Sequence, residues 1–367
     1  MNYMRIIFKK FKARMIVGCI LAVIALLAVS VIVFINQASF GRTPRGERLE
    51  RVMKSPNYRN GEFKNQHETL LMTSDRGRFS GIWEFIFRKI DGLRPEQAVK
   101  AIKTDLRKIG RNEEILVWFG HSSYLIQTGG KRILVDPVFC MASPVSFVNK
   151  PFKGTELYTP DDMPDIDYLV ISHDHWDHLD YNTVKKLKDR IGAVICPLGV
   201  GEHFEYWGFD KERLIELDWN EDANLAPGFM IHCLPARHFS GRRLTANQSL
   251  WASFLLEAPS QKIYIGGDGG YDTHYAEIGN RFPGIDLAIL ENGQYNEEWS
   301  LIHLMPQYMA QTARDLKAKR VLTVHHSKYA LAKHRWDKPL KNAEEMKNKD
   351  SLNVLIPEIG EVVALEK

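Results

Sequence analysis

Hydrophobic residues are distributed unevenly along this chain. An apolar run extends from Met15 to Ile35 without a charged residue, long enough at about 1.5 Å per residue to cross the ~30 Å hydrocarbon core of a bilayer. From residue 36 to about 111 the sequence is polar, and few segments resemble strands. From Ile115 onward, short apolar runs alternate with helical stretches, a pattern typical of sheets with helices packed outside them.

The apolar runs after Ile115 predict a series of short strands. The runs ILVWFGHSSYLIQT and KRILVDPVF flank Gly129-Gly130, which indicates a hairpin. Helices are expected after Asn182, Leu198, Thr273 and Met305, and the stretch Ser55–Gln66 is interpreted as a loop. Further strands are expected at DYLVIS, AVICP, LIELDW, FMIHCLP, LWASFLLE, KIYIGG, DLAIL, RVLTVHH and NVLIP.

The run from 15 to 35 predicts a transmembrane anchor that is not removed. The alternative is a cleaved signal peptide, but its apolar region spans roughly 7–15 residues, and the sequence after this run offers a poor cleavage site at Ala38. Basic residues at 5–14 precede the run, and a second basic group follows it at 42–54. Because the upstream group lies closer to the membrane, the positive-inside rule favours placing the bulk of the chain outside the cytoplasm.

The segment Phe79–Ile90, FSGIWEFIFRKI, is rich in aromatic residues. It fits an amphipathic helix at the membrane interface, and it also fits a segment that packs against the folded domain.

Composition narrows the protein class only slightly. Hydrophobic residues make up 44% and charged residues 26% of the 367 residues, an ordinary globular balance. The net charge of +4 comes partly from the extreme N-terminus, so no nucleic-acid partner is expected. Cys19 lies in the apolar run, and the other cysteines adjoin apolar residues, which favours buried free thiols over disulfides: Cys140, Cys196 and Cys233.

Residue types that commonly bind metals are concentrated in the stretch ISHDHWDHLD. His173, His175, Asp177 and His178 follow directly after a predicted strand. Imidazole nitrogens suit zinc and its neighbours, and carboxylates add hard oxygen ligands. These are more ligands than one ion normally takes from one short loop, so alternate residues could serve two ions. Asp180 is interpreted as part of the turn into the following helix.

Other candidate ligands stand at the ends of later predicted strands. His238 closes FMIHCLPARH, Asp268 ends KIYIGGD, and His325 ends RVLTVH. Each alone is weak evidence, because a histidine at the end of a strand is more often structural. Together with the ligand-rich loop they predict one shared metal site.

At this point the sequence resembles a known family. ISHDHWDHLD matches the H-x-H-x-D-H signature of the metallo-β-lactamase superfamily, and PARH, GGDGGY and TVHH follow in the family's order. The phrases GHSSYLI, LVDPVF, HLDYNTV, ELDW and GGDGGYDTHYAEIGNRF resemble the branch that contains N-acylphosphatidylethanolamine-hydrolysing phospholipase D. The resemblance covers Ile115 to about Lys338.

The resemblance implies an αββα sandwich of the α/β class with two divalent metal ions at one edge. Zinc is the default, and manganese or iron could occupy the same ligands. The ligands carried over are His173, His175 and His238 for the first ion, Asp177, His178 and His325 for the second, and Asp268 as a bridge between them. If the last motif is displaced by one residue, His326 takes the place of His325.

Several residues could surround these metals. His121 could contact substrate or be structural, and Asp136 could fix the tautomer of a ligating histidine or cap the loop at Pro137. By the resemblance, His303 would orient a phosphate or protonate a leaving group. Arg242, with Arg243 beside it, could hold a phosphodiester through its guanidinium or lie in a solvated loop.

The sequence departs from the phospholipase branch at two places. Gly269 follows the bridging Asp268 where the branch commonly has threonine, and ENGQY (Glu291–Tyr295) stands where the branch has PIGAY. Glu291 would change the charge beside the substrate pocket, which puts the lipid substrate in doubt without affecting the metal ligands.

The sequence therefore predicts four segments: a basic flank at 1–14, a transmembrane anchor at 15–35, a linker and N-terminal extension at 36–111, and a catalytic domain at 112–367. The expected function is a membrane-anchored hydrolase in which metal-bridged hydroxide attacks a phosphodiester such as N-acylphosphatidylethanolamine, with Asp177, Asp268 and His303 in catalytic roles. The alternatives are lactone, ester or amide hydrolysis at the same site, and a non-catalytic membrane-tethered binding protein.

Overall fold

The computed structural model describes residues 2–73, 90–145 and 147–365. Two compact units form in this part of the chain, Met1–Gly41 and Arg42–Lys367. The aromatic segment that begins at Phe79 lies, up to residue 89, outside the described residues.

The first unit is dominated by a long helix, α1 (Asn2–Ile35), followed by the 3-10 turn η1 (Ala38–Phe40). Within the stretch Ile6–Ile35, an 18-residue window reaches a mean hydropathy of 3.2. By length and composition this helix can cross a membrane, although a signal sequence near the N-terminus would meet the same criterion.

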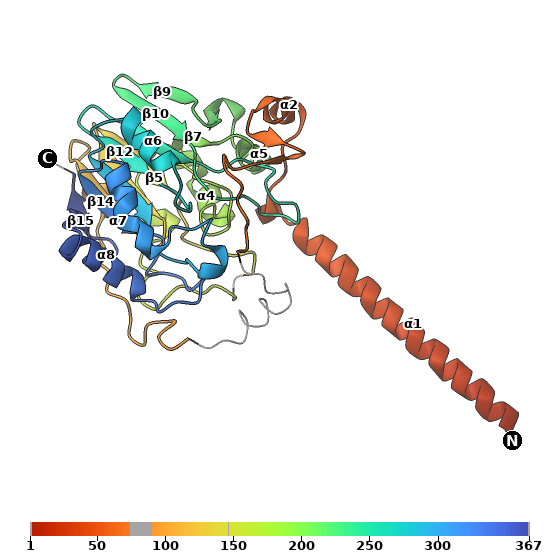
Figure 1. Ribbon diagram of the computed structural model, residues 1–367. Helices are drawn as coiled ribbons and strands as arrows, with labels where there is room; N and C mark the ends of the chain where they lie inside the picture. Colours follow the sequence, from red (N-terminus) through yellow and green to blue (C-terminus); the bar gives the residue numbers. More distant parts are fainter. Residues whose placement is uncertain (1, 74–89, 146, 366–367) are drawn as a thin grey trace. The chain divides into compact units, whose positions relative to one another are not determined.

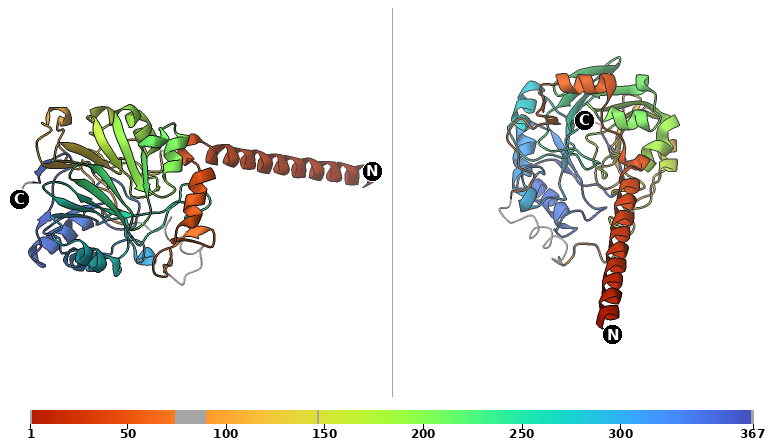
Figure 2. Two further views of the ribbon diagram at one scale, coloured as in Figure 1. Left: turned by 90° about the horizontal axis from the view of Figure 1, so that it is seen from above. Right: turned by 90° about the vertical axis from the view of Figure 1, so that its right-hand side faces the viewer.

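The second unit is a sandwich of two seven-stranded sheets (Figures 1 and 2). The first sheet has the strand order β16 (Val362–Ala364), β3 (Ile115–Trp118), β4 (Tyr124–Thr128), β5 (Lys131–Val135), β6 (Ile166–Val170), β7 (Ile191–Pro197) and β8 (Leu214–Leu217). The second has the order β15 (Val354–Leu355), β14 (Arg320–Val324), β13 (Leu287–Glu291), β12 (Lys262–Ile265), β11 (Ser253–Glu257), β10 (Phe229–Leu234) and β9 (Asp222–Ala226).

Helices cover the outer faces of both sheets. Apolar residues of α4 (Tyr181–Leu187) and α5 (Gly201–Tyr206) pack on the first sheet. Those of α6 (His274–Arg281), α7 (Pro306–Asp315) and α8 (Lys338–Asn348) pack on the second. A third apolar cluster fills the space between the sheets. The predicted αββα sandwich is therefore confirmed.

Shorter elements complete the second unit. The helix α2 (Gly46–Lys54) precedes the sandwich in the chain, and the remaining turns are 3-10 helices: η2 (Leu106–Lys108), η3 (Pro160–Asp162), η4 (Lys188–Arg190), η5 (Lys211–Arg213) and η6 (Glu297–Trp299).

Strand direction explains where the functional residues gather. β5 to β8 run parallel to one another, as do β12 to β15. The carboxyl ends of such strands share one edge of a sheet. The ligand-rich loop follows β6, Asp268 follows β12, and His325 follows β14. The two sheets thus bring these segments together at one edge of the sandwich.

Two interpretations from the sequence are wrong. The stretch Ser55–Gln66 is a hairpin of β1 (Tyr58–Arg59) and β2 (Glu62–Phe63), not a loop. Its turn is Asn60-Gly61 with φ of 57° and 82°, the left-handed geometry that an Asn-Gly pair favours in tight hairpins. Cys140 is exposed, whereas Cys196 and Cys233 are buried free thiols as expected.

The hairpin contributes directly to the core. Phe63 has no exposed surface and packs in the cluster between the sheets. We expect Phe63→Ala to lower the free energy of unfolding by about 3–5 kcal/mol, because a large buried ring is lost and a cavity remains. Urea unfolding would measure the difference, with the exposed Leu244→Ala as control. A Phe63→Ala protein as stable as this control would contradict the packing.

Candidate metal centre

The loop after β6 is held in shape from both sides. At its end, the Asp180 carboxylate caps helix α4 by accepting from the amide of Asn182 at 3.0 Å and from the Thr183 hydroxyl, as the turn interpretation predicted. Near its start, the Asp174 carboxylate accepts hydrogen bonds from the Gly241 amide at 2.7 Å and the Ser249 hydroxyl at 2.9 Å. Between them, His175, Asp177 and His178 contribute side chains to the centre described next.

The first cluster consists of His173, His175 and His238. Nδ1 of His175 lies 2.9 Å from Nε2 of His173 and 3.2 Å from Nε2 of His238. Burial lowers the pKa of all three imidazoles, so they are neutral near pH 7. The His238 Nδ1 donates to the carbonyl of Ile302 at 2.7 Å. The Nε2 of His238 therefore presents a lone pair to the cluster.

The second cluster consists of His121, Asp177, His178 and His325, whose ligand atoms lie within 4.8 Å of one another. The Asp136 carboxylate accepts from His178 Nδ1 at 2.8 Å and from the Ser172 amide at 2.8 Å. Asp136 therefore has the tautomer-fixing role, rather than only capping a turn.

Left-handed backbone surrounds the second cluster. His121, Asp136 and His325 have φ of 53°, 40° and 67°, which costs of order 1 kcal/mol or more for residues with a side chain. The amide of His325 donates to the carbonyl of His121 at 2.9 Å, and the His121 amide donates to His326. These bonds across the two sheets hold the strained segments in place.

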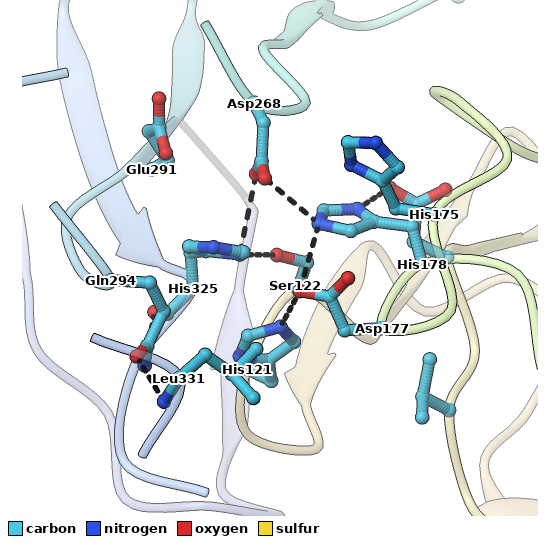
Figure 3. Close-up of polar contacts among 12 residues, drawn as sticks. His121, Ser122, His175, Asp177, His178, Asp268, Glu291, Gln294, His325 and Leu331 are labelled. Atoms are coloured by element: carbon cyan, nitrogen blue, oxygen red, sulfur yellow. Dashed lines mark hydrogen bonds and ion pairs between the residues drawn. The ribbon is translucent and has the colours of Figure 1, made fainter. Parts of the chain in front are cut away.

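Asp268 joins the two clusters (Figure 3). Its carboxylate lies 3.2 Å from His178 Nε2, 3.2 Å from His325 Nδ1 and 3.9 Å from His238 Nε2. Burial opposes ionisation, but the imidazoles of His178 and His325 hold the pKa of Asp268 well below its usual value. The carboxylate is therefore charged and central.

The chemistry of this centre fits cations. Within the described residues, Nε2 of His178 and Oδ1 of Asp268 are buried and have no hydrogen-bond partner, and neutral imidazole nitrogens of the first cluster converge within about 3 Å of one another. Burial opposes a charge on His178, yet Asp268 and Asp136 raise its pKa well above the usual value, so the surroundings favour positive charge. Nitrogen and carboxylate ligands in this mixture suit zinc and neighbouring transition metals.

His325, rather than His326, belongs to the centre. The His326 ring instead packs on Trp118 with centroids 4.8 Å apart, and its Nδ1 pairs with the Ser327 hydroxyl at 2.8 Å.

Glu291 and His303 form a buried pair beside the clusters. The Glu291 carboxylate accepts from Nδ1 of His303 at 2.7 Å and from the amides of Gly269 and Leu304, both at 2.7 Å. Burial raises the pKa of Glu291 to about 7. Burial opposes a charge on His303, but the carboxylate raises the pKa of that ring to about 9. Glu291 thus keeps His303 protonated at neutral pH. Any effect of Glu291 on a substrate would therefore be indirect, through His303.

Arg242 is 4% exposed, so the alternative of a solvated loop is wrong for this residue. Its guanidinium donates to the carbonyls of Asp174 and Leu179 and lies 4.1 Å from the centre of the Trp176 ring. Burial lowers its pKa to about 10. Arg242 therefore supports the ligand-rich loop, while the predicted substrate contact stays a prediction. Arg243 is half-buried.

The sequence left two possible roles for His121, a substrate contact or a structural role. It is fully buried, and its Nε2 lies 3.0 Å from the Asp177 carboxylate. Burial lowers the pKa of this ring despite the nearby carboxylate. His121 therefore orients Asp177 or joins it as a ligand. Its substrate contact stays a prediction.

A cleft of about 590 Å³ opens onto the clusters. His175 and Asp177 lie in its wall, together with apolar residues that include Leu93, Val148, Phe239 and Leu331. The loop that carries Leu331 is held by the Gln294 side chain, whose oxygen accepts from the amides of Leu331 and Ala332 at 2.8 and 3.0 Å (Figure 3). The cleft is thus mostly apolar and has metal-binding side chains in its wall.

Supporting residues were not anticipated from the sequence. Ser122 contacts His325 Nδ1 at 2.8 Å, and Asn65 bonds to the backbone of His238. No motif marks these residues, because their role depends on which segments the fold brings together. Ser122 lies within the phrase GHSSYLI, which was the one available signal.

Comparison with known proteins agrees with this geometry. Residues 131–326 match the family model described as "Beta-lactamase superfamily domain". An uncharacterized protein of Mycobacterium tuberculosis is 35% identical over 84% of each chain. An N-acyl-phosphatidylethanolamine-hydrolyzing phospholipase D of Caenorhabditis elegans is 29% identical over 58% of this chain and 64% of that protein. A solved metallo hydrolase of Ignicoccus hospitalis shares the fold, with a TM-score of 0.53, 20% identity and coverage of 69% of this chain and 98% of that one.

The fold and the clustered ligands define a metal-dependent hydrolase. The chain belongs to the metallo-β-lactamase superfamily.

Asp136 offers a direct test of how the centre is built. We expect Asp136→Asn to weaken zinc binding about 10- to 100-fold, because the amide cannot accept the His178 proton as a carboxylate does. Competition with a chromophoric chelator would measure the affinity. The exposed Asp165→Asn serves as control, and equal affinities for the two variants would refute the role given to Asp136.

Proposed function

We propose that this protein is a membrane-anchored, dinuclear hydrolase that cleaves a phosphodiester in a substrate with a long apolar part, such as an N-acylated phospholipid. The observation that carries the proposal is the mostly apolar cleft with His175 and Asp177 in its wall. An apolar lining suits acyl chains, whereas the clusters beside it suit the charged end of such a molecule.

The metal ligands we propose are the residues of the two clusters that match the family motif: His173, His175 and His238 for one ion, Asp177, His178 and His325 for the other, and Asp268 between them. Two bound divalent cations would lower the pKa of water, supply a hydroxide nucleophile at neutral pH and offset charge on the phosphate. The charged carboxylate of Asp268 would reduce the repulsion between two such cations.

We infer that His303 acts as a general acid. Its ring lies 5.1 Å from that of His238 and 5.7 Å from that of His325, and its side chain is 13% exposed. The Glu291 carboxylate keeps this ring protonated. A protonated imidazole beside the clusters can give its proton to the leaving alkoxide, which is the role the resemblance implied.

Similarity to the phospholipase D of C. elegans supports the choice of substrate. Zinc-loaded protein should release phosphatidic acid and an N-acylethanolamine from liposomes that contain N-acylphosphatidylethanolamine. Mass spectrometry of both products would measure the reaction. Failure of this release, together with hydrolysis of simple lactones or esters, would favour the alternative hydrolase. Failure of every reaction by metal-loaded protein would favour the non-catalytic alternative.

The role of His303 predicts a particular loss of rate. We expect His303→Gln to lower kcat about 10²–10⁴-fold, the range typical of a lost general acid, while zinc content stays the same. With the pKa of His303 raised to about 9, the ring holds its proton below that pH, so activity should fall as pH rises through about 9. A His303→Gln protein with the original rate and pH profile would contradict this role.

Helix α1 predicts membrane attachment, which can be tested separately from activity. The full chain should stay in the membrane pellet after alkaline carbonate extraction, and a chain lacking residues 1–35 should be released. In sealed right-side-out vesicles, a membrane-impermeant maleimide should label the exposed Cys140, with Cys140→Ser as control. Labelling only after detergent treatment would place the catalytic domain in the cytoplasm instead.

A further inference from the structure

The N-terminal part of the second unit contacts the surroundings of one cluster, whereas Asp136 is linked to both clusters through the Ser172 hydroxyl, which contacts His173 and His178. Residues 42–65, here named the N-terminal brace, contain α2 and the β1–β2 hairpin and lie outside the matched family region of 131–326. The brace contacts the surroundings of the first cluster, His173, His175 and His238, at two separate places.

The first place is the backbone of His238. The Asn65 side chain donates from Nδ2 to the His238 carbonyl at 2.8 Å and accepts from the His238 amide at Oδ1, at 3.1 Å. The indole of Trp251, which is 1% exposed, donates to the same Oδ1 at 3.1 Å. The Asn65 side chain thus satisfies both the amide and the carbonyl of His238. These two bonds fix the backbone position from which the His238 imidazole extends.

The second place is Asp174, the residue between His173 and His175. The amide of Arg42 donates to Nδ1 of His203 at 3.0 Å. The proton of His203 is therefore on Nε2, which donates to the Asp174 carboxylate at 3.1 Å. His203 is 4% exposed and Asp174 is 4% exposed, so water does not replace these bonds easily.

The brace is itself firmly attached. The Arg48 guanidinium pairs with Glu202 at 2.6 Å, Glu216 at 2.6 Å and Glu205 at 2.9 Å. The amide of Phe63 donates at 2.9 Å to the carbonyl of Asn247, in the loop after His238. Because Arg48 is nearly buried and holds several carboxylates, its pairs are stronger than surface ion pairs.

The second cluster is supported from elsewhere. Its supports are Ser122, which contacts His325, and Asp136, which accepts from His178. Ser122 lies between β3 and β4, and Asp136 directly follows β5. Among the described residues, none of the hydrogen bonds of these two supports goes to residues 42–65.

We propose that the N-terminal brace positions the first metal site selectively, so that Asn65 and His203 set the metal affinity of His173, His175 and His238 but not that of the other position. The inference rests on the ligand set of the proposed function. It assigns Asn65 and His203 as positioning residues, which hold ligands without contacting the metal or the substrate.

The experiment isolates each metal position before the brace is altered. In a His325→Ala background, the remaining zinc reports on the first site, and in a His173→Ala background it reports on the second. Zinc affinity is measured in both backgrounds by chelator competition, with and without Asn65→Ala. Asn57→Ala is the matched control, because Asn57 lies in the same brace and its side chain bonds to Asp218 at 2.8 Å, away from both clusters.

We expect Asn65→Ala to weaken zinc binding about tenfold or more in the His325→Ala background, as losses of ligand-supporting bonds generally do, and to change it less than twofold in the His173→Ala background. Asn57→Ala should leave zinc affinity unchanged in both. If Asn65→Ala does not fold, His203→Phe should show the same selectivity, since phenylalanine can keep the ring stacking on Trp207.

The outcomes separate this inference from the ligand assignment. Equal weakening in both backgrounds, or none in either, would overturn the selective role of the brace while leaving the two metal positions intact. If neither background binds zinc at one ion per chain, the ligand set fails, and the brace proposal fails with it.

Discussion

Buried, neutral imidazoles lie against the charged carboxylate of Asp268, and the surrounding structure is arranged to hold these groups in place. Ring nitrogens of His173 and His238 lie 2.9 and 3.2 Å from Nδ1 of His175, and Asp268 stands between this group and the second cluster. Such an arrangement is costly unless a cation occupies it. The edge of the sandwich, the left-handed turns and the supporting hydrogen bonds keep these groups together. The close packing of imidazoles and a carboxylate explains why the protein belongs to a metal-dependent class.

The sequence predicted this centre better than it predicted the rest of the fold. The motif ISHDHWDHLD and the strand ends at His238, Asp268 and His325 contain residue types whose metal-binding chemistry can be recognised from the sequence alone. The edge strands β9 and β16 and the helix α8 were missed, because they are short or weakly patterned and gain stability from packing. The hairpin at Asn60-Gly61 was also missed, although its turn signal is strong, because the surrounding residues are polar.

Supports of the site were harder to predict than its ligands. The solvated-loop alternative for Arg242 is wrong, because this residue is buried against the backbone of the ligand-rich loop, a contact that its sequence context did not reveal. Glu291 accepts hydrogen bonds from His303 and two backbone amides, which its sequence context did not reveal. Such roles depend on contacts between residues far apart in sequence. The candidate metal ligands could therefore be recognised from local sequence motifs, whereas the residues that position them could be recognised only from the folded structure.

We propose that two metal ions bind at this edge of the sandwich with Asp268 between them. Anomalous diffraction at the zinc absorption edge, from crystals of the zinc-loaded protein, tests it most directly. We expect two peaks, one contacted by His173, His175 and His238, the other by Asp177, His178 and His325, with Asp268 between them. A single peak, or peaks placed away from Asp268, would contradict it.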